Sequence, residues 1–319
     1  MSDLPLPTRP LGDSGQNVSV VGLGCNNFGR RTDLAGTRAV IDAALDAGVT
    51  FLDTADIYGQ RGRSEEYLGE VLSSQPSRRD RVVLATKFGM DMHDGKGPRG
   101  SRAYVRDAVQ ASLRRLQTDV IDYYWYHEPD GVTPIEETLG ALHELVTAGT
   151  VRAIGASNFT GAQLREAAAV AQRDGLTPFT AVQNEYSLLV RGDEQDALPA
   201  CRELGIGYVP FFPLASGLLT GKYRRGEPAP EGTRLAERDQ VATSAQFDLI
   251  EALASYAQTR GVSLLDVAIG GLLADATIPT VIAGATRPDQ VRSNAAAARW
   301  IPAGDDLREL RQLLADHPL

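Results

Sequence analysis

Short β-rich runs alternate with stretches of helical periodicity along almost the whole chain. Residues 39–47, for example, carry apolar side chains at helical spacing, and Gly48 ends that stretch. Such an alternation predicts a mostly parallel sheet covered by helices. The runs that we predict as strands are 19–23, 49–52, 82–85, 120–126, 151–156, 180–182, 207–211 and 279–283.

Eight strands, each followed by room for a helix, favour a closed (β/α)8 TIM barrel over an open doubly wound sheet. The chain has 319 residues, a length that one such barrel accommodates, and we expect a single domain over 1–319. Residues 9–18, with a Gly-Asp-Ser-Gly turn at 12–15, predict a β-hairpin before the first barrel strand. Residues 305–314 predict an extra C-terminal helix.

Helix starts and one long loop can also be located in the sequence. Thr133 has the position of an N-cap with Pro134 as the first helical residue, and Thr160 with Gln163 predicts a capping box. Residues 222–240 are rich in glycine, proline and charge, which predicts a long loop. That loop is either functional or a surface excursion.

Charge and cysteine content exclude several classes of function. The net charge of -9 argues against a surface for nucleic acid or for an anionic membrane. The first ten residues hold no apolar run of the kind found in signal peptides, and no later stretch is long and apolar enough to span a bilayer. Cys25 and Cys201 are too few for a disulfide framework, so we expect a cytoplasmic protein.

Polar side chains stand at the carboxyl ends of several predicted strands. In an α/β barrel those ends meet at one rim, and the loops there form the active site. Each residue alone has an ordinary structural explanation, such as a cap, a solvated strand end or a packed aromatic. The residues in question are Asp53, Lys87, His127, Ser157 with Asn158, and Gln183, and Tyr58 follows Asp53 in the next loop.

Four of these residues together suggest proton transfer to a carbonyl oxygen. A phenol with a pKa of about 10 is a weak acid at neutral pH, and the ammonium of Lys87 would lower the pKa of Tyr58. Asp53 would hold that ammonium in place. His127 would donate a hydrogen bond to the same oxygen as Tyr58.

Other chemistries fit the sequence less well. The four histidines are scattered and form no His-Glu-x-x-His motif, so we predict no metal site. No Gly-x-Ser-x-Gly motif occurs. Residues 22–27 begin like a dinucleotide fingerprint, but Asn27 takes the place of its third glycine, and we interpret these glycines as a tight turn.

Several motifs in order resemble the aldo-keto reductase family, in particular the branch similar to potassium-channel β-subunits. They are residues 51–59, 85–89, 127–130, 155–159 and 182–187. The resemblance implies a catalytic tetrad of Asp53, Tyr58, Lys87 and His127. Tyr58 would supply the proton, and the cofactor, NADPH with its oxidised form NADP+, would supply a hydride.

The resemblance also implies where the cofactor lies. Ser157, Asn158 and Gln183 would hold the carboxamide, Phe211 would stack on the nicotinamide, and Lys222 would approach the pyrophosphate. Residues 284–294 resemble the adenosine segment, although many relatives carry Lys and Arg at positions 284 and 290. The other residues implied to bind cofactor are Gly24, Cys25, Asn26, Phe212, Pro213, Leu214, Ser216, Gly217, Arg234, Gly284, Thr286, Arg287, Gln290 and Asn294.

By position, Asn27, Phe28, Phe88 and Glu128 would surround a small-molecule carbonyl substrate, with packing as the alternative for Phe88. Two functions remain open. One is reduction of aldehydes or ketones, and the other is an NADP(H)-binding regulatory or redox-sensing subunit with little turnover. The resemblance implies asparagine at position 127 in such regulatory subunits, so His127 favours the enzyme. The sequence leaves the substrate, the reaction direction and the oligomeric state open.

Overall fold

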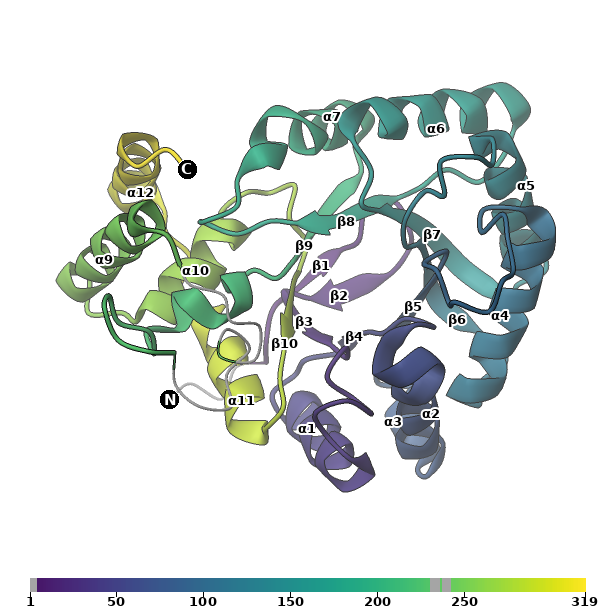
Figure 1. Cartoon of the computed structure of the whole chain (residues 1–319), viewed down its shortest axis with the longest axis horizontal. Helices are drawn as coiled ribbons and strands as arrows, with labels where there is room; N and C mark the ends of the chain where they lie inside the picture. Colours follow the sequence, from purple (N-terminus) through teal and green to yellow (C-terminus); the bar gives the residue numbers. More distant parts are fainter. Residues whose placement is uncertain (1–4, 230–235, 237–241) are drawn as a thin grey trace.

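Eight parallel strands form a closed ring in the computed structural model, which describes residues 5–229, 236 and 242–319 (Figure 1). Neighbours in the ring follow the chain order, and the last strand closes against the first. The prediction of a (β/α)8 barrel is therefore confirmed. The strands are β3 (Val21–Gly24), β4 (Phe51–Asp53), β5 (Val83–Phe88), β6 (Ile121–Tyr126), β7 (Val151–Ser157), β8 (Ala181–Glu185), β9 (Gly207–Phe211) and β10 (Val281–Gly284).

Six of the eight barrel strands extend further toward their carboxyl ends than the apolar runs predicted, and β6 and β9 end where predicted. Strand β5 continues through Lys87 to Phe88, and β8 continues through Gln183 to Glu185. The ladder partners explain the extension, because Lys87 pairs with Trp125 and Gln183 pairs with Val209. Both polar side chains are thus held on strand backbone at the rim.

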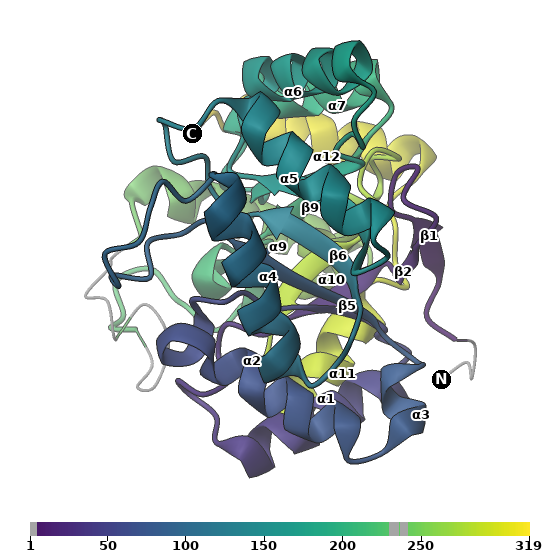
Figure 2. The same cartoon turned by 90° about the vertical axis from the view of Figure 1, so that its right-hand side faces the viewer.

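Helices surround the ring on its outside (Figures 1 and 2). The extra helix predicted at the C-terminal end is present as α12 (Gly304–Asp316), which packs against α9 (Ser244–Thr259). The remaining helices are α1 (Leu34–Asp46), α2 (Tyr58–Ser73), α3 (Pro76–Arg79), α4 (Arg102–Leu116), α5 (Ile135–Thr147), α6 (Gly161–Asp174), α7 (Ala197–Leu204), α10 (Leu264–Leu273) and α11 (Pro288–Ala297), with 3-10 turns η1 (Gly192–Gln195) and η2 (Ala215–Thr220).

The predicted N-terminal hairpin is present and closes the amino end of the barrel. Strands β1 (Thr8–Pro10) and β2 (Asn17–Ser19) pair antiparallel. Leu11 and Val18 are fully buried in one apolar cluster with barrel residues that include Trp125. At the turn, Gly12 has a φ of 53°, and a Cβ there would lie 2.0 Å from the carbonyl oxygen of Thr180. Only glycine fits this contact. Because the hairpin covers the amino end of the barrel, the carboxyl end is the open one.

The two predicted helix starts have different outcomes. The capping box of Thr160 and Gln163 is confirmed at the start of α6. The prediction for Thr133 is wrong, because Pro134 is the N-cap residue of α5 and makes no side-chain cap. The hydroxyl of Thr133 instead donates to the carboxylate of Asp130 at 2.7 Å. Asp130 also accepts from the main-chain N–H of Thr133 at 2.8 Å, so Thr133 is held in the preceding loop and not at the cap position, where a hydroxyl would accept from a helical N–H.

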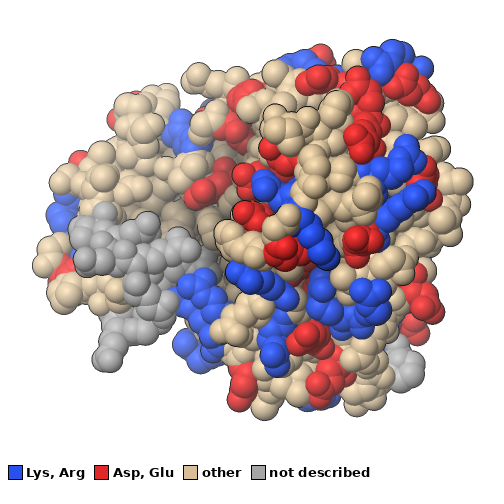
Figure 3. All heavy atoms as spheres, turned by 45° about the vertical axis from the view of Figure 1, so that its right-hand side comes forward, with Lys and Arg blue, Asp and Glu red and all other residues tan. Residues whose placement is uncertain are grey.

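Charged side chains of both signs are interspersed on the face that Figure 3 shows. Some of them link neighbouring helices. Arg106 of α4 donates to Glu144 of α5 at 2.8 Å, and Arg165 of α6 donates to Glu203 of α7 at 2.7 Å. Exposed pairs of this kind add little stability, and the apolar core between helices and barrel carries the packing. Among the described residues, no helix is both long and apolar enough to cross a membrane.

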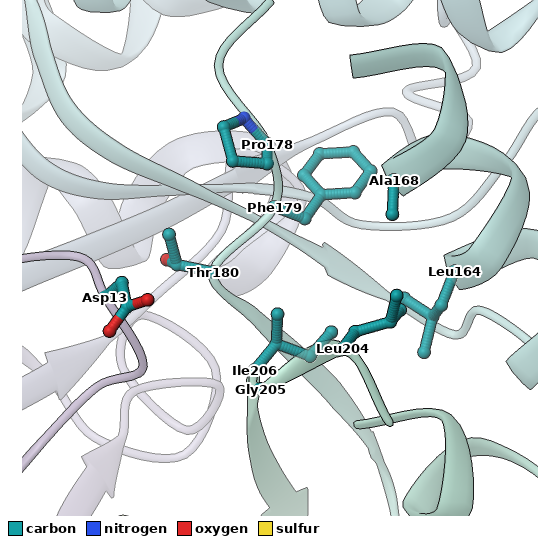
Figure 4. Close-up of a pocket in the computed structure, with 9 residues that line it drawn as sticks. All are labelled: Asp13, Leu164, Ala168, Pro178, Phe179, Thr180, Leu204, Gly205 and Ile206. Carbon is teal, nitrogen blue, oxygen red and sulfur yellow. The ribbon is translucent and has the colours of Figure 1, made fainter. Parts of the chain in front are cut away.

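A small cavity of about 130 Å³ lies at the amino ends of β8 and β9 (Figure 4). Phe179 and Ile206 precede those two strands and line the cavity with Leu164 of α6 and Leu204 of α7. Asp13 of the hairpin turn contributes a carboxylate at its edge. This cavity is therefore at the barrel end opposite to the predicted site.

Candidate active site

A cavity of about 1120 Å³ lies at the carboxyl end of the barrel. Every barrel strand contributes to its lining, either by its last residues or by the loop that follows it. Its volume is slightly above the usual range for small-molecule sites, about 300–1,000 Å³. The position is the one predicted from the polar strand ends, and it is the usual place for an active site in this fold.

The four residues of the predicted tetrad meet at this cavity. Lys87 is completely buried, and its Nζ donates to Oδ2 of Asp53 and, at 2.8 Å, to the carbonyl oxygen of Thr54. The same Nζ lies 5.0 Å from the ring centroid of Tyr58. The rings of Tyr58 and His127 meet edge to face at 5.7 Å between centroids. Tyr58, His127 and Asp53 line the cavity, and Lys87 lies behind them.

An irregular turn at the start of α2 presents Tyr58 to the cavity. The three residues after it, Gly59, Gln60 and Arg61, all have φ between 64° and 68°. A Cβ at Gly59 would lie 2.4 Å from the carbonyl oxygen of Phe28, so glycine is required there. This irregular turn takes the place of a regular first helical turn and sets the position of the Tyr58 ring.

The charge of Lys87 is maintained by its neighbours. Burial alone would lower the pKa of Lys87, but the carboxylate of Asp53 and the hydroxyl of Tyr58 more than offset it and raise the pKa above its ordinary value. Gln183 donates from Nε2 to Oδ1 of Asp53 at 3.0 Å and satisfies the second carboxylate oxygen. A buried ammonium is thus paired and hydrogen-bonded, as its desolvation requires.

Burial raises the pKa of Tyr58 above its ordinary value, and Lys87 lowers it only in part. Lys87 lowers the pKa of Tyr58, as expected, but burial raises it by more, so the net pKa lies above the ordinary value. The physical reason is desolvation, which disfavours the phenolate more than the neighbouring ammonium stabilises it. Tyr58 consequently keeps its proton at neutral pH and is available as an acid.

His127 is neutral at neutral pH. Burial, reinforced by the charge of Lys87, lowers the pKa of its imidazole well below the ordinary value. Its Nδ1 is buried and has no hydrogen-bond partner among the described residues. Its main-chain carbonyl accepts from the side-chain amide of Asn158 at 2.9 Å, and Asn158 itself has a φ of 57°. A neutral imidazole can donate a single hydrogen bond to a substrate oxygen.

Most residues predicted to bind cofactor line the same cavity. Cys25 and Ser157 are buried behind the lining, where Sγ of Cys25 donates to the carbonyl oxygen of Leu23 at 3.4 Å. Arg234 lies outside the described residues. The predicted residues in the lining are Gly24, Asn26, Asn158, Gln183, Phe211, Phe212, Pro213, Leu214, Ser216, Gly217, Lys222, Gly284, Thr286, Arg287, Gln290 and Asn294.

The lining fits a dinucleotide. Gly24 and Gly284 are register partners at the ends of β3 and β10, and a Cβ on Gly24 would approach Ile282 to 3.0 Å. The two glycines leave a flat wall on which a ligand can come close to the backbone. At the far side, the N-terminus of α11 and the cations of Lys222 and Arg287 provide donors for phosphate groups.

Two of the four residues predicted for the substrate pocket are placed elsewhere. Asn27 and Glu128 line the cavity, whereas Phe28 and Phe88 are fully buried and do not. The ring of Phe88 stacks on Tyr126 at 5.1 Å between centroids. For Phe88 the packing alternative is the correct one, because β5 turns this side chain toward the helices.

The cavity is also lined by residues to which the sequence analysis assigned no role in the site. Arg31 and Met90 lie in the loops after β3 and β5. They are close in sequence to the predicted residues Asn27 and Lys87, and this closeness was the signal that could have identified them as part of the lining. Asp289 lies inside the quoted adenosine segment and had no role assigned. Further residues in this group are Pro129, Gln163, Thr220, Leu265, Ile282, Ala283, Ala285 and Ser293.

Asp56, within the first motif, lies behind the site. It is buried, its Oδ1 has no hydrogen-bond partner among the described residues, and it does not line the cavity. Burial first, and then the charge of Glu65, raise the pKa of Asp56 to about 8. At neutral pH this acid is therefore largely protonated. No three His, Cys, Asp or Glu residues in the described part of the chain are grouped as a metal site requires.

The comparison with known protein families and the geometry of the site point to the same family. The family model described as "Aldo/keto reductase family" matches residues 20–313. The chain belongs to the aldo/keto reductase family. Reductases of this family act on carbonyl groups with nicotinamide cofactors, so the chain is an oxidoreductase, and the family predicted from the motifs is confirmed.

Three relatives that match over nearly their whole length carry two kinds of description. The chain is 37% identical over 311 residues to the "Uncharacterized oxidoreductase YrpG" of Bacillus subtilis (strain 168), covering 95% of this chain and 94% of that protein. Two plant proteins are each described as a "Probable voltage-gated potassium channel subunit beta". The chain is 35% identical over 304 residues to that of Oryza sativa subsp. japonica and 33% identical over 304 residues to that of Arabidopsis thaliana, covering 92% of each chain.

Proposed function

We propose that this protein reduces aldehydes or ketones to alcohols with NADPH, and that Tyr58 donates the proton. The observation that supports this most directly is the meeting of Tyr58 and His127 at the cavity wall, with the charged Lys87 behind the phenol. Two neutral donors converge where a carbonyl oxygen would gain charge. An acid with a cation behind it is the arrangement that proton transfer to that oxygen needs.

Each residue of the tetrad has its own part in the proposed reaction. The nicotinamide cofactor supplies a hydride to the carbonyl carbon when it is bound. Tyr58 holds the proton that the carbonyl oxygen receives, and the neutral imidazole of His127 donates a hydrogen bond to that oxygen. Lys87 stabilises the phenolate that remains on Tyr58, and Asp53 keeps Lys87 charged and in place. The phenolate then recovers a proton from solvent.

The preference for NADPH over NADH rests on the cations of the lining. Lys222 and Arg287 both face the cavity, and Arg287 stands at the N-terminus of α11. Charge-assisted hydrogen bonds to phosphate typically contribute about 1.5–3 kcal/mol each. NADPH carries one phosphate more than NADH, on the adenosine ribose, so Arg287 at the start of α11 favours NADPH, whereas Lys222, implied to approach the pyrophosphate, serves both cofactors.

A second candidate function is a cofactor-binding regulatory subunit with little turnover. The descriptions of the two plant relatives as probable channel subunits favour it. The presence of His127 beside Tyr58 favours the enzyme, because a regulatory subunit has no use for a second donor to a substrate oxygen. Turnover therefore separates the two candidates.

We expect purified protein to oxidise NADPH in the presence of at least one member of a panel of aldehydes and ketones. The loss of reduced nicotinamide absorbance measures the rate, and the alcohol product is identified by chromatography. Tyr58→Phe is the blank, since it removes only the proposed acid. Tight NADPH binding without turnover of any carbonyl compound would instead support the regulatory subunit.

His127→Asn is expected to lower kcat by about 10²-fold, the lower end of the effect of removing one donor to a developing oxyanion. An amide still donates a hydrogen bond, so residual turnover should remain. Because burial and the charge of Lys87 lower the pKa of His127 well below its ordinary value, the pH profile of the parent protein should show no break near the ordinary histidine pKa of about 6.5.

The matched control is His143→Asn, since His143 lies on α5, bonds to Thr177 and is outside the cavity lining. NADPH affinity, measured by fluorescence titration, should be unchanged in both variants. A collapse of NADPH binding in His127→Asn would show that the imidazole holds the cofactor and not the substrate.

A further inference from the structure

An ion pair lies within the cavity at the start of α11. The guanidinium of Arg287 forks onto the carboxylate of Asp289, with Nε to Oδ1 and Nη2 to Oδ2 both at 3.1 Å. Both residues line the cavity, and their side chains are 62% and 65% exposed. The cation that would bind a phosphate is therefore already bound to an internal anion.

The pair lies where the adenosine half of a dinucleotide would extend. The reacting half has to lie beside Tyr58, at the ends of β4 and β6. The remaining length of the cavity runs past η2 to the N-terminus of α11, where Arg287 is the N-cap residue. A phosphate on the adenosine ribose, which distinguishes NADPH from NADH, would meet this helix end first.

The uncharged donors at the same place do not distinguish the two cofactors. The main-chain N–H groups of Thr286 and Arg287 and the hydroxyl of Thr286 all point to Oε1 of Gln290, at 2.8, 3.3 and 3.1 Å. A neutral amide oxygen satisfies them, and a ribose hydroxyl or a phosphate oxygen can replace it. Only the charge of Arg287 is specific for phosphate, and Asp289 neutralises that charge.

We propose that Asp289 limits the preference for NADPH over NADH, because the ribose phosphate has to compete with its carboxylate for the guanidinium of Arg287. The inference rests on the proposed cofactor site, and it concerns a residue that takes no part in proton transfer. The pairing also keeps the pKa of Asp289 below its ordinary value, so the carboxylate stays charged at neutral pH. Its charge repels the phosphate as well.

Asp289→Asn keeps the shape of the side chain and removes its charge. We expect the Kd for NADPH to fall by about two- to fivefold, the range that corresponds to one exposed ion pair, with no change in the Kd for NADH. Both constants are measured by fluorescence titration. The gain should shrink at high salt, since screening weakens interactions between exposed charges.

Asp305→Asn is the matched control. Asp305 is an exposed first-turn acid of α12, pairs with Arg308 and does not line the cavity. It changes the net charge by the same amount, so it should leave both dissociation constants as in the parent protein.

A double-mutant cycle with Arg287→Met completes the test. Arg287→Met should weaken NADPH binding selectively, and Asp289→Asn should then have no further effect, because its influence acts through the guanidinium. An unchanged Kd for NADPH in Asp289→Asn, or an equal gain for NADH, would overturn the proposal, and so would a parent protein that binds neither cofactor. A parent protein that binds both without carbonyl turnover would overturn the proposed function and leave this inference standing.

Discussion

Lys87→Met is expected to reduce the free energy of unfolding by about 3–5 kcal/mol and to lower turnover as well. The ammonium of Lys87 is completely buried and donates to Asp53 and to the carbonyl oxygen of Thr54. Removing it leaves the carboxylate of Asp53 in the interior without a countercharge, although Gln183 still donates to its Oδ1. Urea denaturation followed by circular dichroism measures the loss of stability.

A second variant separates stability from catalysis. In Asp53→Asn combined with Lys87→Met, the uncompensated charge is gone, so much of the lost stability should return. Turnover should remain low, because no cation stands behind Tyr58. Lys96→Met, at an exposed lysine near Asp94, is the control and should change neither quantity. A loss of stability in Lys87→Met as small as in that control would show that the buried pair is not needed for folding.

The barrel was predictable because its signal is spread along the whole chain. Alternating strand and helix patterns locate eight strands even where one pattern is short, such as that of β8. The strand ends were less accurate, because a polar residue such as Gln183 interrupts the apolar run while the strand continues along its ladder. Hydropathy carries no information about hydrogen bonding between strands, so the predicted strand ends before the observed one.

The tetrad was predictable because the fold brings strand ends together. Asp53, Lys87 and His127 are far apart in sequence, yet each lies within one residue of the last residue of a parallel strand, and a closed barrel places them on one rim. What could not be predicted depends on three-dimensional packing. The side on which Phe88 lies, and the degree of burial that raises the pKa of Tyr58, follow from neighbours that no local pattern names.

The sequence also could not predict which neighbours the predicted residues pair with. Arg287 was predicted to meet a phosphate, but its engagement by Asp289 depends on the side-chain geometry at the start of α11. The same holds for Gln183, which donates to Asp53 and so links the predicted carboxamide site to the tetrad. Sequence patterns indicate which residues gather at a site, and the structure shows which charges are already satisfied there.

Tyr58→Phe is expected to lower the rate of carbonyl reduction by about 10²–10⁴-fold, the usual contribution of a positioned acid. The substitution removes one oxygen and keeps the ring, including its contact with the ammonium of Lys87 at 5.0 Å. Folding and NADPH affinity should therefore be preserved. Because burial raises the pKa of Tyr58, its acid form persists through neutral pH, and reduction by the parent protein should slow only at alkaline pH.

The decisive measurement is a single turnover with NADPH bound and an aldehyde that the parent protein accepts, since it observes the chemical step without product release. Melting temperature and NADPH affinity are recorded on the same preparations. Tyr67→Phe is the matched control, because Tyr67 lies on the same helix, α2, outside the cavity lining. If Tyr58→Phe reduced the aldehyde as fast as this control, another group would have to protonate the oxygen. The role of Tyr58 would then be to shape the cavity, even if the barrel and cofactor assignments held.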